Sequence, residues 1–132
     1  MKHLPTEAIL DKMTTPEKAN LCDGEGSWHT HGVERLGIPG AMMTDGPHGL
    51  RKMVMKDGKW STNAATCMPT ASALAASWNR AVAAHAANTI AKDAIAEGVA
   101  VVLGPGVNMK RSPLCGRNFE YFSEDPYFAG SF

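Results

Sequence analysis

A long helix followed at once by a β-branched run constrains the fold of this chain more than any other feature of its sequence. Asn79 is a favoured N-cap, and Gly98 closes a helix predicted to run to about Glu97. Residues 99–103 (VAVVL) are typical of a strand covered on both faces, and residues 38–44 (IPGAMMT) of an earlier, short buried strand. Strand, helix and strand in this order predict a right-handed βαβ unit with parallel strands.

The predicted helix carries its apolar side chains on one side of the helical wheel. These are Ala83, Ala86, Ala87, Ile90, Ala91, Ala94 and Ile95. Since most of them are alanine, we expect the helix to approach its packing partner closely through this face. Two parallel strands alone would have poorly covered edges and faces, so we expect a partner or a longer chain to complete the sheet.

Local signals predict the remaining segments. Thr15, followed by proline and glutamate, predicts the start of a short helix. This helix is expected to end at the glycines from Gly24 onward, and a glycine-rich loop is expected over residues 27–37. Residues 49–66 are read as a long, polar and irregular excursion. Ser123 is read as the cap of another helix, whose first turn is acidic and contains a proline.

Charge and cysteine content exclude several classes of function. The 132 residues include 13 basic and 13 acidic side chains, so the chain has no strong electrostatic reason to bind nucleic acid or an anionic membrane. No stretch approaches the roughly 20 apolar residues that span a bilayer, and the first residues lack the apolar core of a secretory signal. Three irregularly spaced cysteines predict a reduced, cytoplasmic protein.

Polar residues gather after the two predicted strands, at the face where parallel α/β folds bind ligands. Asp45 follows the first strand. A mixed group follows the second: Asn108, Lys110, Arg111, Arg117, Glu120, Glu124 and Asp125. Asp45 either binds a ligand or stabilises the turn before Gly46. Arg111 and Arg117 either form structural ion pairs or bind a polyol, since guanidinium and carboxylate groups suit vicinal hydroxyls.

Other candidate residues have simpler structural explanations. Aromatic side chains that could face a sugar ring are more often part of a core; they are Trp28, Trp60, Phe119 and Tyr121. His29, His31 and Cys22 lack the spacing of a zinc motif, so no metal is predicted. The glycine pairs do not extend to GxGxxG or to a P-loop, so the sequence does not favour a nucleotide-binding site. There is also no GxSxG nucleophile motif.

Four segments carry a resemblance to a known enzyme family. They are GSWHTHGVERLGIP (residues 26–39), MMTDGPHGLRK (42–52), CMPTASALAASWNR (67–80) and LGPGVNMKRSPLCGRNFEYFSEDPYFAG (103–130). From about Thr14 onward the chain resembles the N-terminal half of a family 3 glycoside hydrolase of the β-glucosidase type. The KRSPLCGRNFEYFSEDP stretch is long and rich in rare residues, so chance is a poor explanation.

The resemblance implies an α/β fold that is the incomplete N-terminal part of a TIM-type (β/α)8 barrel. A closed barrel usually takes about 250 residues, so residues 1–132 would supply the first two or so βα units. Family members add an α/β sandwich domain and release β-linked glucose from non-reducing ends with retention of configuration. Retention requires two nearby carboxyl groups, a nucleophile and an acid/base.

The resemblance places both catalytic carboxyl groups outside this chain. The nucleophile is an aspartate in an SDW-like motif, and none of the tryptophans here has that context. The acid/base glutamate lies in the second domain, and a sugar-binding lysine–histidine pair also lies beyond this stretch. The sugar-binding part carries over: Asp45 and Arg51 match the DGPxGLR segment, and Arg117 matches the GR-x-FE segment. Glu120 is expected to brace Arg117.

The resemblance therefore predicts a fragment of a retaining β-glucosidase that acts on β-glucosides or oligosaccharides without a metal or cofactor. We expect the 132-residue chain alone to have negligible hydrolase activity. Xyloside or N-acetylglucosaminide specificity stays open. Two further alternatives stay open: a non-catalytic sugar-binding or partner protein that kept Asp45, Arg51 and Arg117, and a truncation product that is unstable alone.

Overall fold

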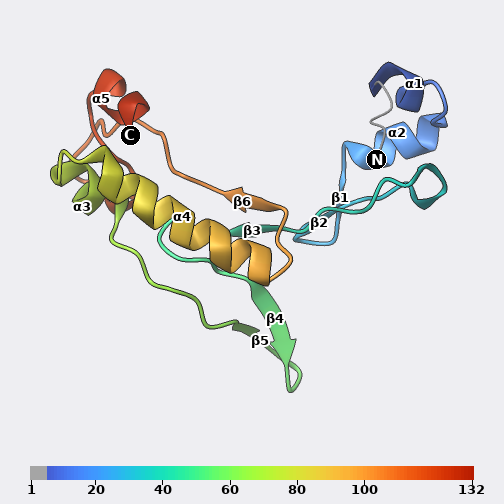
Figure 1. The fold of residues 1–132 in the computed structure, drawn as a ribbon, viewed down its shortest axis with the longest axis horizontal. Helices are drawn as coiled ribbons and strands as arrows, with labels where there is room; N and C mark the ends of the chain where they lie inside the picture. Colours follow the sequence, from blue (N-terminus) through green and yellow to red (C-terminus); the bar gives the residue numbers. More distant parts are fainter. Residues whose placement is uncertain (1–5) are drawn as a thin grey trace. The chain divides into compact units, whose positions relative to one another are not determined.

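The computed structural model describes residues 6–132 (Figure 1). The chain separates into two compact units, the first ending at Met43 and the second spanning Thr44–Phe132. Each unit is described by itself. None of the helices described is long and apolar enough to cross a membrane.

The first unit begins with two short helices, α1 (Thr6–Leu10) and α2 (Thr15–Leu21). The prediction of a helix start here is confirmed, but the cap is Thr14 and not Thr15. The Thr14 hydroxyl accepts the N–H of Glu17 at 3.4 Å, and the Glu17 carboxylate accepts the N–H of Thr14 at 2.8 Å. This reciprocal pair requires a separation of three residues, which places the cap one residue earlier.

Arg35 ties this helix start to the chain that follows it. Its guanidinium contacts both carboxylate oxygens of Glu17, at 2.6 and 2.5 Å, and donates to the carbonyl of Lys12 at 2.8 Å. The Arg35 hydrogen bonds, followed by that of the Thr14 N–H, lower the pKa of Glu17 from 4.5 to about 2.

Glu17 is therefore expected to make this part of the first unit sensitive to acid. A depressed pKa stabilises the folded state above the unfolded value of 4.5, and this stabilisation is lost as the pH falls towards about 2. An NMR pH titration of the Glu17 carboxyl should give a midpoint near 2 in the wild type and a clearly higher one in Arg35→Gln. Equal midpoints in the two proteins would contradict the assignment.

The predicted glycine-rich loop contains short regular elements. Strands β1 (Gly24–Glu25) and β2 (His29–Thr30) pair antiparallel, and a 3-10 turn, η1 (Glu34–Leu36), follows. Val33 and Ile38 then exchange backbone hydrogen bonds across η1, at 2.8 and 3.2 Å. Residues 38–42 are held in this turn and against β2, so the strand predicted over residues 38–44 is wrong in its extent: β3 is Met43–Asp45.

The second unit contains the predicted strand–helix–strand core. β3 pairs with β6 (Val101–Leu103), and α4 (Arg80–Ala96) lies between them in sequence (Figure 1). The Asn79 side chain accepts the N–H of Ala81 at 3.0 Å, and Gly98 has a φ of +67°, so both predicted ends of the helix are confirmed.

Residues 49–66 are not irregular as predicted. They form an antiparallel hairpin of β4 (Met53–Lys56) and β5 (Lys59–Thr62), in which Met55 pairs with Trp60. Asp57 and Gly58 turn the chain with φ of +51° and +73°. An Asp-Gly pair between two short runs is a strong hairpin signal, because both positions tolerate positive φ. The Asp-Gly pair is present in the sequence, but the polar composition of residues 49–66 led to the prediction of an irregular segment.

Lys52 fastens the base of this hairpin to the end of α4. Its ammonium donates to the carbonyl of Glu97 at 2.6 Å and lies 3.2 Å from the Glu97 carboxylate. The side chain of Asn63 donates to the same carboxylate at 2.7 Å. The hydrogen bonds from Asn63 and then Lys52 lower the pKa of Glu97.

Three short elements complete the second unit: α3 (Ala71–Ala76), the 3-10 turn η2 (Asn118–Glu120) and α5 (Pro126–Ser131). The sequence did not predict α3, although Thr70 caps it by accepting the N–H of Ala73. The predicted last helix is present, but its cap is Asp125, which accepts the N–H of Tyr127 at 2.8 Å. Ser123 instead accepts the N–H of Asp125 at 3.0 Å.

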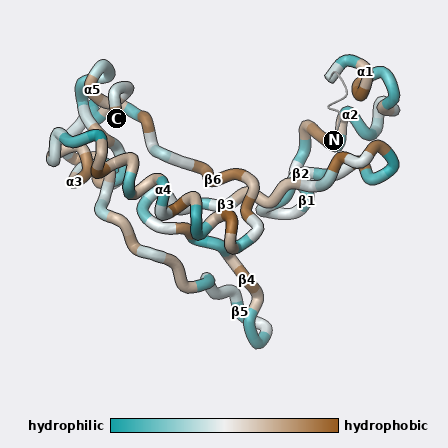
Figure 2. The backbone as a smooth tube through the Cα atoms, in the orientation of Figure 1, coloured by the Kyte–Doolittle hydropathy of each residue, from teal (hydrophilic) through white to brown (hydrophobic). Residues whose placement is uncertain are grey.

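Burial corrects two expectations about the core. On α4 only Ala83, Ala86 and Ala94 are buried, whereas Ile95 is 79% exposed. Strand β6 is hydrophobic (Figure 2), but Val101 and Leu103 are 43% and 49% exposed, so it is not covered on both faces as predicted. Val101 and Leu103 are two residues apart on the strand and therefore point to the same face, which the other elements described leave open.

The rest of the predicted apolar face of α4 borders an open cavity of about 260 Å³. Ala87, Ile90 and Ala91 line it together with Val102 of β6 and the rings of Phe122 and Phe132. The α/β character of the chain is therefore confirmed, while residues 6–132 by themselves form three two-stranded sheets and do not close a barrel.

Candidate sugar-binding site

Asp45 and Arg51 face each other across a tight turn that begins where β3 ends. Asp45 is the last residue of the strand and not the residue after it. Its carbonyl accepts the N–H of Arg51 at 2.9 Å, and the hydroxyl of the fully buried Thr44 donates to the Arg51 carbonyl at 2.9 Å. The Arg51 guanidinium also pairs with the Asp45 carboxylate. The turn therefore presents the two charged groups side by side.

Both interpretations of Asp45 receive support from its contacts. One carboxylate oxygen accepts the N–H of the next residue, Gly46, at 3.1 Å, which restrains the start of the turn. The side chain is nevertheless 40% exposed, and that of Arg51 56% exposed. A carboxylate has about four lone-pair positions, so Asp45 keeps acceptor capacity for hydroxyl groups while it holds the turn.

The turn is possible only because residue 46 is glycine. Gly46 has a φ of +128°, and a Cβ there would overlap the carbonyl oxygen of Gly49 and lie 2.7 Å from the N of Arg51. Those atoms belong to the backbone that returns Arg51 to Asp45. A side chain at this position would therefore separate the two charged groups.

Arg117 and Glu120 form the second half of the site. Arg117 directly precedes the turn η2 and Glu120 is its last residue, and the Arg117 guanidinium pairs with the Glu120 carboxylate. The side chain of Arg117 is 71% exposed, whereas that of Glu120 is 16% exposed. This pairing lowers the pKa of Glu120 and raises that of Arg117. The pair leaves the exposed guanidinium of Arg117 accessible to a ligand.

The two halves meet at the turn that follows β6. A Cβ at Gly104 would lie 2.9 Å from the Cβ of Pro47, and one at Gly106 would lie 2.9 Å from the carbonyl oxygen of Glu120. Both site segments therefore pack on the backbone of residues 104–106. The charge of Asp45 contributes to the raised pKa of Arg117, after the larger contributions of Glu120 and Tyr121, as expected for neighbouring groups.

This arrangement suits neutral polyols better than strongly charged ligands. Two guanidinium groups and two carboxylates lie together, so the net charge of the four groups is zero. Guanidinium N–H groups donate and carboxylate oxygens accept, which matches the two functions of a sugar hydroxyl.

The other residues predicted for this face are not part of the two ion pairs. Asp125 is the cap of α5, and among residues 6–132 neither Arg111 nor Glu124 forms an ion pair. Phe119 is 51% exposed and its ring lies 5.8 Å from that of His48, beside the site. Trp60 is 63% exposed on the hairpin β4–β5 and is not part of a core.

Sequence reasoning missed His48 and Ser72, which connect the two halves, and named Lys110 without a role in this connection. His48 accepts the N–H of Ala71 through Nε2 at 3.0 Å, and Lys110 donates to the hydroxyl of Ser72 at 2.6 Å. Only the position of His48 within the DGPHGLR segment could have drawn attention to it. Ser72 lies in an alanine-rich stretch, where a lone serine carries no signal.

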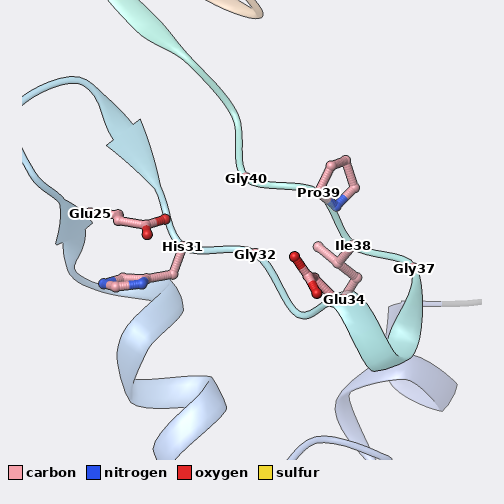
Figure 3. A pocket seen from close by; sticks show the side chains of 8 residues that line it. All are labelled: Glu25, His31, Gly32, Glu34, Gly37, Ile38, Pro39 and Gly40. Atoms are coloured by element: carbon pink, nitrogen blue, oxygen red, sulfur yellow. The ribbon is translucent and has the colours of Figure 1, made fainter.

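A separate pocket of about 700 Å³ lies in the first unit (Figure 3). Glu25, His31 and Glu34 line it together with the glycines and Pro39 of the turn after η1. Of the predicted candidates it includes only His31, and the part of the chain that the structure describes holds no group of three His, Cys, Asp or Glu residues arranged for a metal ion.

Known proteins resemble this chain over most of its length. Residues 19–132 match the family described as "Glycosyl hydrolase family 3 N terminal domain". The chain is 54% identical over 125 residues to Thermostable beta-glucosidase B of Acetivibrio thermocellus. That match covers 92% of this chain and 16% of that protein. It is 52% identical over 129 residues to the Exo-alpha-(1->6)-L-arabinopyranosidase of Bifidobacterium breve. That match covers 95% of this chain and 17% of that protein.

A solved structure shares the fold over nearly the whole chain. The beta-glucosidase of Kluyveromyces marxianus in complex with glucose superposes with a TM-score of 0.88 at 41% identity, over 97% of this chain and 15% of that chain. The sequence here thus spans about one sixth of the length of these relatives.

Proposed function

Because this chain belongs to glycosyl hydrolase family 3, we propose that it supplies part of the glucose-binding subsite of a retaining β-glucosidase. The single observation that carries the proposal is the convergence of the Asp45–Arg51 and Arg117–Glu120 pairs at the turn after β6. In this proposal the chain is the first part of a TIM-type barrel, residues 1–132 of a longer enzyme. The alternatives are outcomes of the experiment below.

Each charged group has a distinct task in the proposed subsite. Asp45 accepts hydrogen bonds from two vicinal hydroxyls of the terminal glucose. Arg51 pairs with that carboxylate and binds the same glucose, and Arg117 donates to a further hydroxyl while Glu120 fixes its orientation. These groups orient the sugar ring, so that catalytic carboxyl groups outside this chain reach its anomeric carbon.

The reaction and its setting are proposed on the same basis. Hydrolysis with retention uses one carboxylate as nucleophile and one carboxylic acid as proton donor and then base, without a metal or cofactor. The three cysteines, Cys22, Cys67 and Cys115, are exposed and form no disulfide, which supports a reducing compartment such as the cytoplasm.

A chimera tests the proposal directly. The matching first part of Thermostable beta-glucosidase B, 54% identical, is replaced by this chain, and hydrolysis of p-nitrophenyl β-D-glucoside is measured. We expect an active chimera, whereas the 132-residue chain alone releases no glucose above a mock-purified control. A chimera that folds but binds no glucoside would contradict the proposal. Glucose binding by the chain alone, by calorimetry, would instead favour a sugar-binding protein.

Arg117→Met in the chimera should raise KM about tenfold or more, because one charge-assisted hydrogen bond to the sugar is lost. Arg111→Met is the matched control, since Arg111 lies on the same segment and makes no ion pair within residues 6–132. We expect it to keep the KM of the parent chimera. Equal effects of the two substitutions would remove Arg117 from the subsite.

A second substrate class has a specific reason to be included. The relative from Bifidobacterium breve is named an Exo-alpha-(1->6)-L-arabinopyranosidase and is 52% identical to this chain, nearly as similar as the β-glucosidase. The same assay therefore compares p-nitrophenyl α-L-arabinopyranoside with the β-glucoside, β-xyloside and N-acetyl-β-glucosaminide. The ratio of their kcat/KM values shows which pyranose ring the subsite prefers.

A further inference from the structure

The first turn of α3 lies between the two halves of the proposed subsite and contacts both. On one side the N–H of Ala71 donates to Nε2 of His48, in the turn between Asp45 and Arg51, at 3.0 Å. On the other side the hydroxyl of Ser72 lies 2.9 Å from the carbonyl oxygen of Asn118, in the turn η2 that carries Glu120. Two adjacent residues of one helix thus join the two segments.

The Ser72 hydroxyl contacts more than one carbonyl group of the second segment. Its hydroxyl also lies 3.3 Å from the carbonyl oxygens of Phe119 and of Tyr121. The three carbonyls of residues 118, 119 and 121 therefore surround one hydroxyl. This arrangement fixes the curvature of the backbone that follows Arg117.

Lys110 fixes the direction of these hydrogen bonds. Its ammonium lies 2.6 Å from the Ser72 hydroxyl and can only donate, so the serine oxygen accepts from it. The single hydroxyl proton of Ser72 is then directed to the carbonyls of η2. The backbone N–H of Lys110 donates to the carbonyl of Ser123 at 3.2 Å, which closes the loop that contains Arg117.

The helix that carries Ser72 is itself well anchored. Ala71, Leu74 and Ala75 are 2%, 6% and 4% exposed, and Thr70 caps the helix. Buried neighbours on both sides of Ser72 restrict its Cα, so its hydroxyl is a fixed point for the exposed loop. The ring of His48 against that of Phe119 adds an apolar contact between the same segments.

From these contacts we propose that Ser72, oriented by Lys110, is a positioning residue that sets where the Arg117–Glu120 pair stands relative to Asp45. The inference rests on the proposed function, since its consequence is the strength of sugar binding. Ser72 contacts no sugar in this scheme and acts only through the backbone of η2. Loss of its hydroxyl would leave all four charged side chains present but Arg117 misplaced.

Two measurements test the proposal. Amide hydrogen exchange of the 132-residue chain, followed by mass spectrometry, reports the order of residues 118–121 in the wild type and in Ser72→Ala. Steady-state kinetics of the chimera with p-nitrophenyl β-D-glucoside separate KM from kcat. Ser72→Thr keeps the hydroxyl, and Ser61→Ala removes an exposed hydroxyl on β5, in a hairpin that carries none of the four charged side chains of the subsite.

We expect Ser72→Ala to speed exchange in residues 118–121 about tenfold while the hairpin β4–β5 is unchanged. KM should rise about fivefold with kcat altered less than about twofold, because a misplaced Arg117 weakens binding of substrate and transition state alike. Lys110→Met should change both quantities in the same direction. Ser72→Thr should restore wild-type values, and Ser61→Ala should keep them.

Unchanged exchange in residues 118–121 would overturn the proposal, as would an equal loss in kcat and kcat/KM that Ser72→Thr does not restore. Failure of the proposed function is a different result: the unsubstituted chimera would be folded but inactive on every glycoside. The exchange measurement would still decide whether Ser72 orders the Arg117 segment.

Discussion

Asp45→Ala in the chimera is expected to lower kcat/KM for the β-glucoside at least about 100-fold. The substitution removes an acceptor of two hydroxyl groups, and a charge-assisted hydrogen bond contributes about 1.5–3 kcal/mol, where 1.4 kcal/mol is a factor of ten. It also leaves Arg51, whose only ion pair within residues 6–132 is with Asp45, without its partner. Steady-state kinetics at matched protein concentration measure the loss.

Two variants separate binding from the stabilisation of the turn. Asp45→Asn keeps an acceptor for the N–H of Gly46 but loses the charge, so it should restore the fold and little of the activity. Asp23→Ala is the matched control, because the Asp23 carboxylate likewise accepts the N–H of the glycine that follows it, Gly24, at 2.8 Å. If Asp23→Ala reduced kcat/KM as much as Asp45→Ala, the effect would be one of folding and not of sugar binding.

Gly46→Ala is expected to have the largest effect on stability, lowering the free energy of unfolding by about 3 kcal/mol or more. Its φ of +128° is unfavourable for alanine, and the new Cβ would overlap backbone atoms of Gly49 and Arg51. Backbone strain of this kind costs on the order of 1–3 kcal/mol by itself, and the overlap adds to it. Urea unfolding of the 132-residue chain, followed by circular dichroism, measures the loss.

Two other glycines divide this effect into its parts. Gly58 has a φ of +73° but open space around it, so Gly58→Ala should show the cost of backbone strain alone. Gly116 has neither a positive φ nor a neighbour within 4 Å, so Gly116→Ala should change stability by less than about 0.5 kcal/mol. A destabilisation by Gly46→Ala no larger than that of Gly58→Ala would mean that the turn adjusts to the side chain.

The sequence by itself determined the elements whose signals lie within a few residues of one another. The ends of α4 are of this kind, since Asn79 binds the N–H two residues later and Gly98 takes a positive φ. The signal for the hairpin β4–β5 is equally local, because it is the adjacent pair Asp57 and Gly58, which form the turn with positive φ. Four sequence motifs also placed the chain in its family.

Burial and the partners of charged residues were decided only by the tertiary structure. Helical periodicity grouped Ile95 with Ala83, but Ile95 is 79% exposed, because the elements that pack on α4 reach only part of its apolar side. Ser72 and Lys110 are 38 residues apart in the sequence, but the Lys110 ammonium lies 2.6 Å from the Ser72 hydroxyl. Nothing in the sequence indicates that these two side chains meet. Such contacts depend on how whole elements pack, and local signals carry no information about that packing.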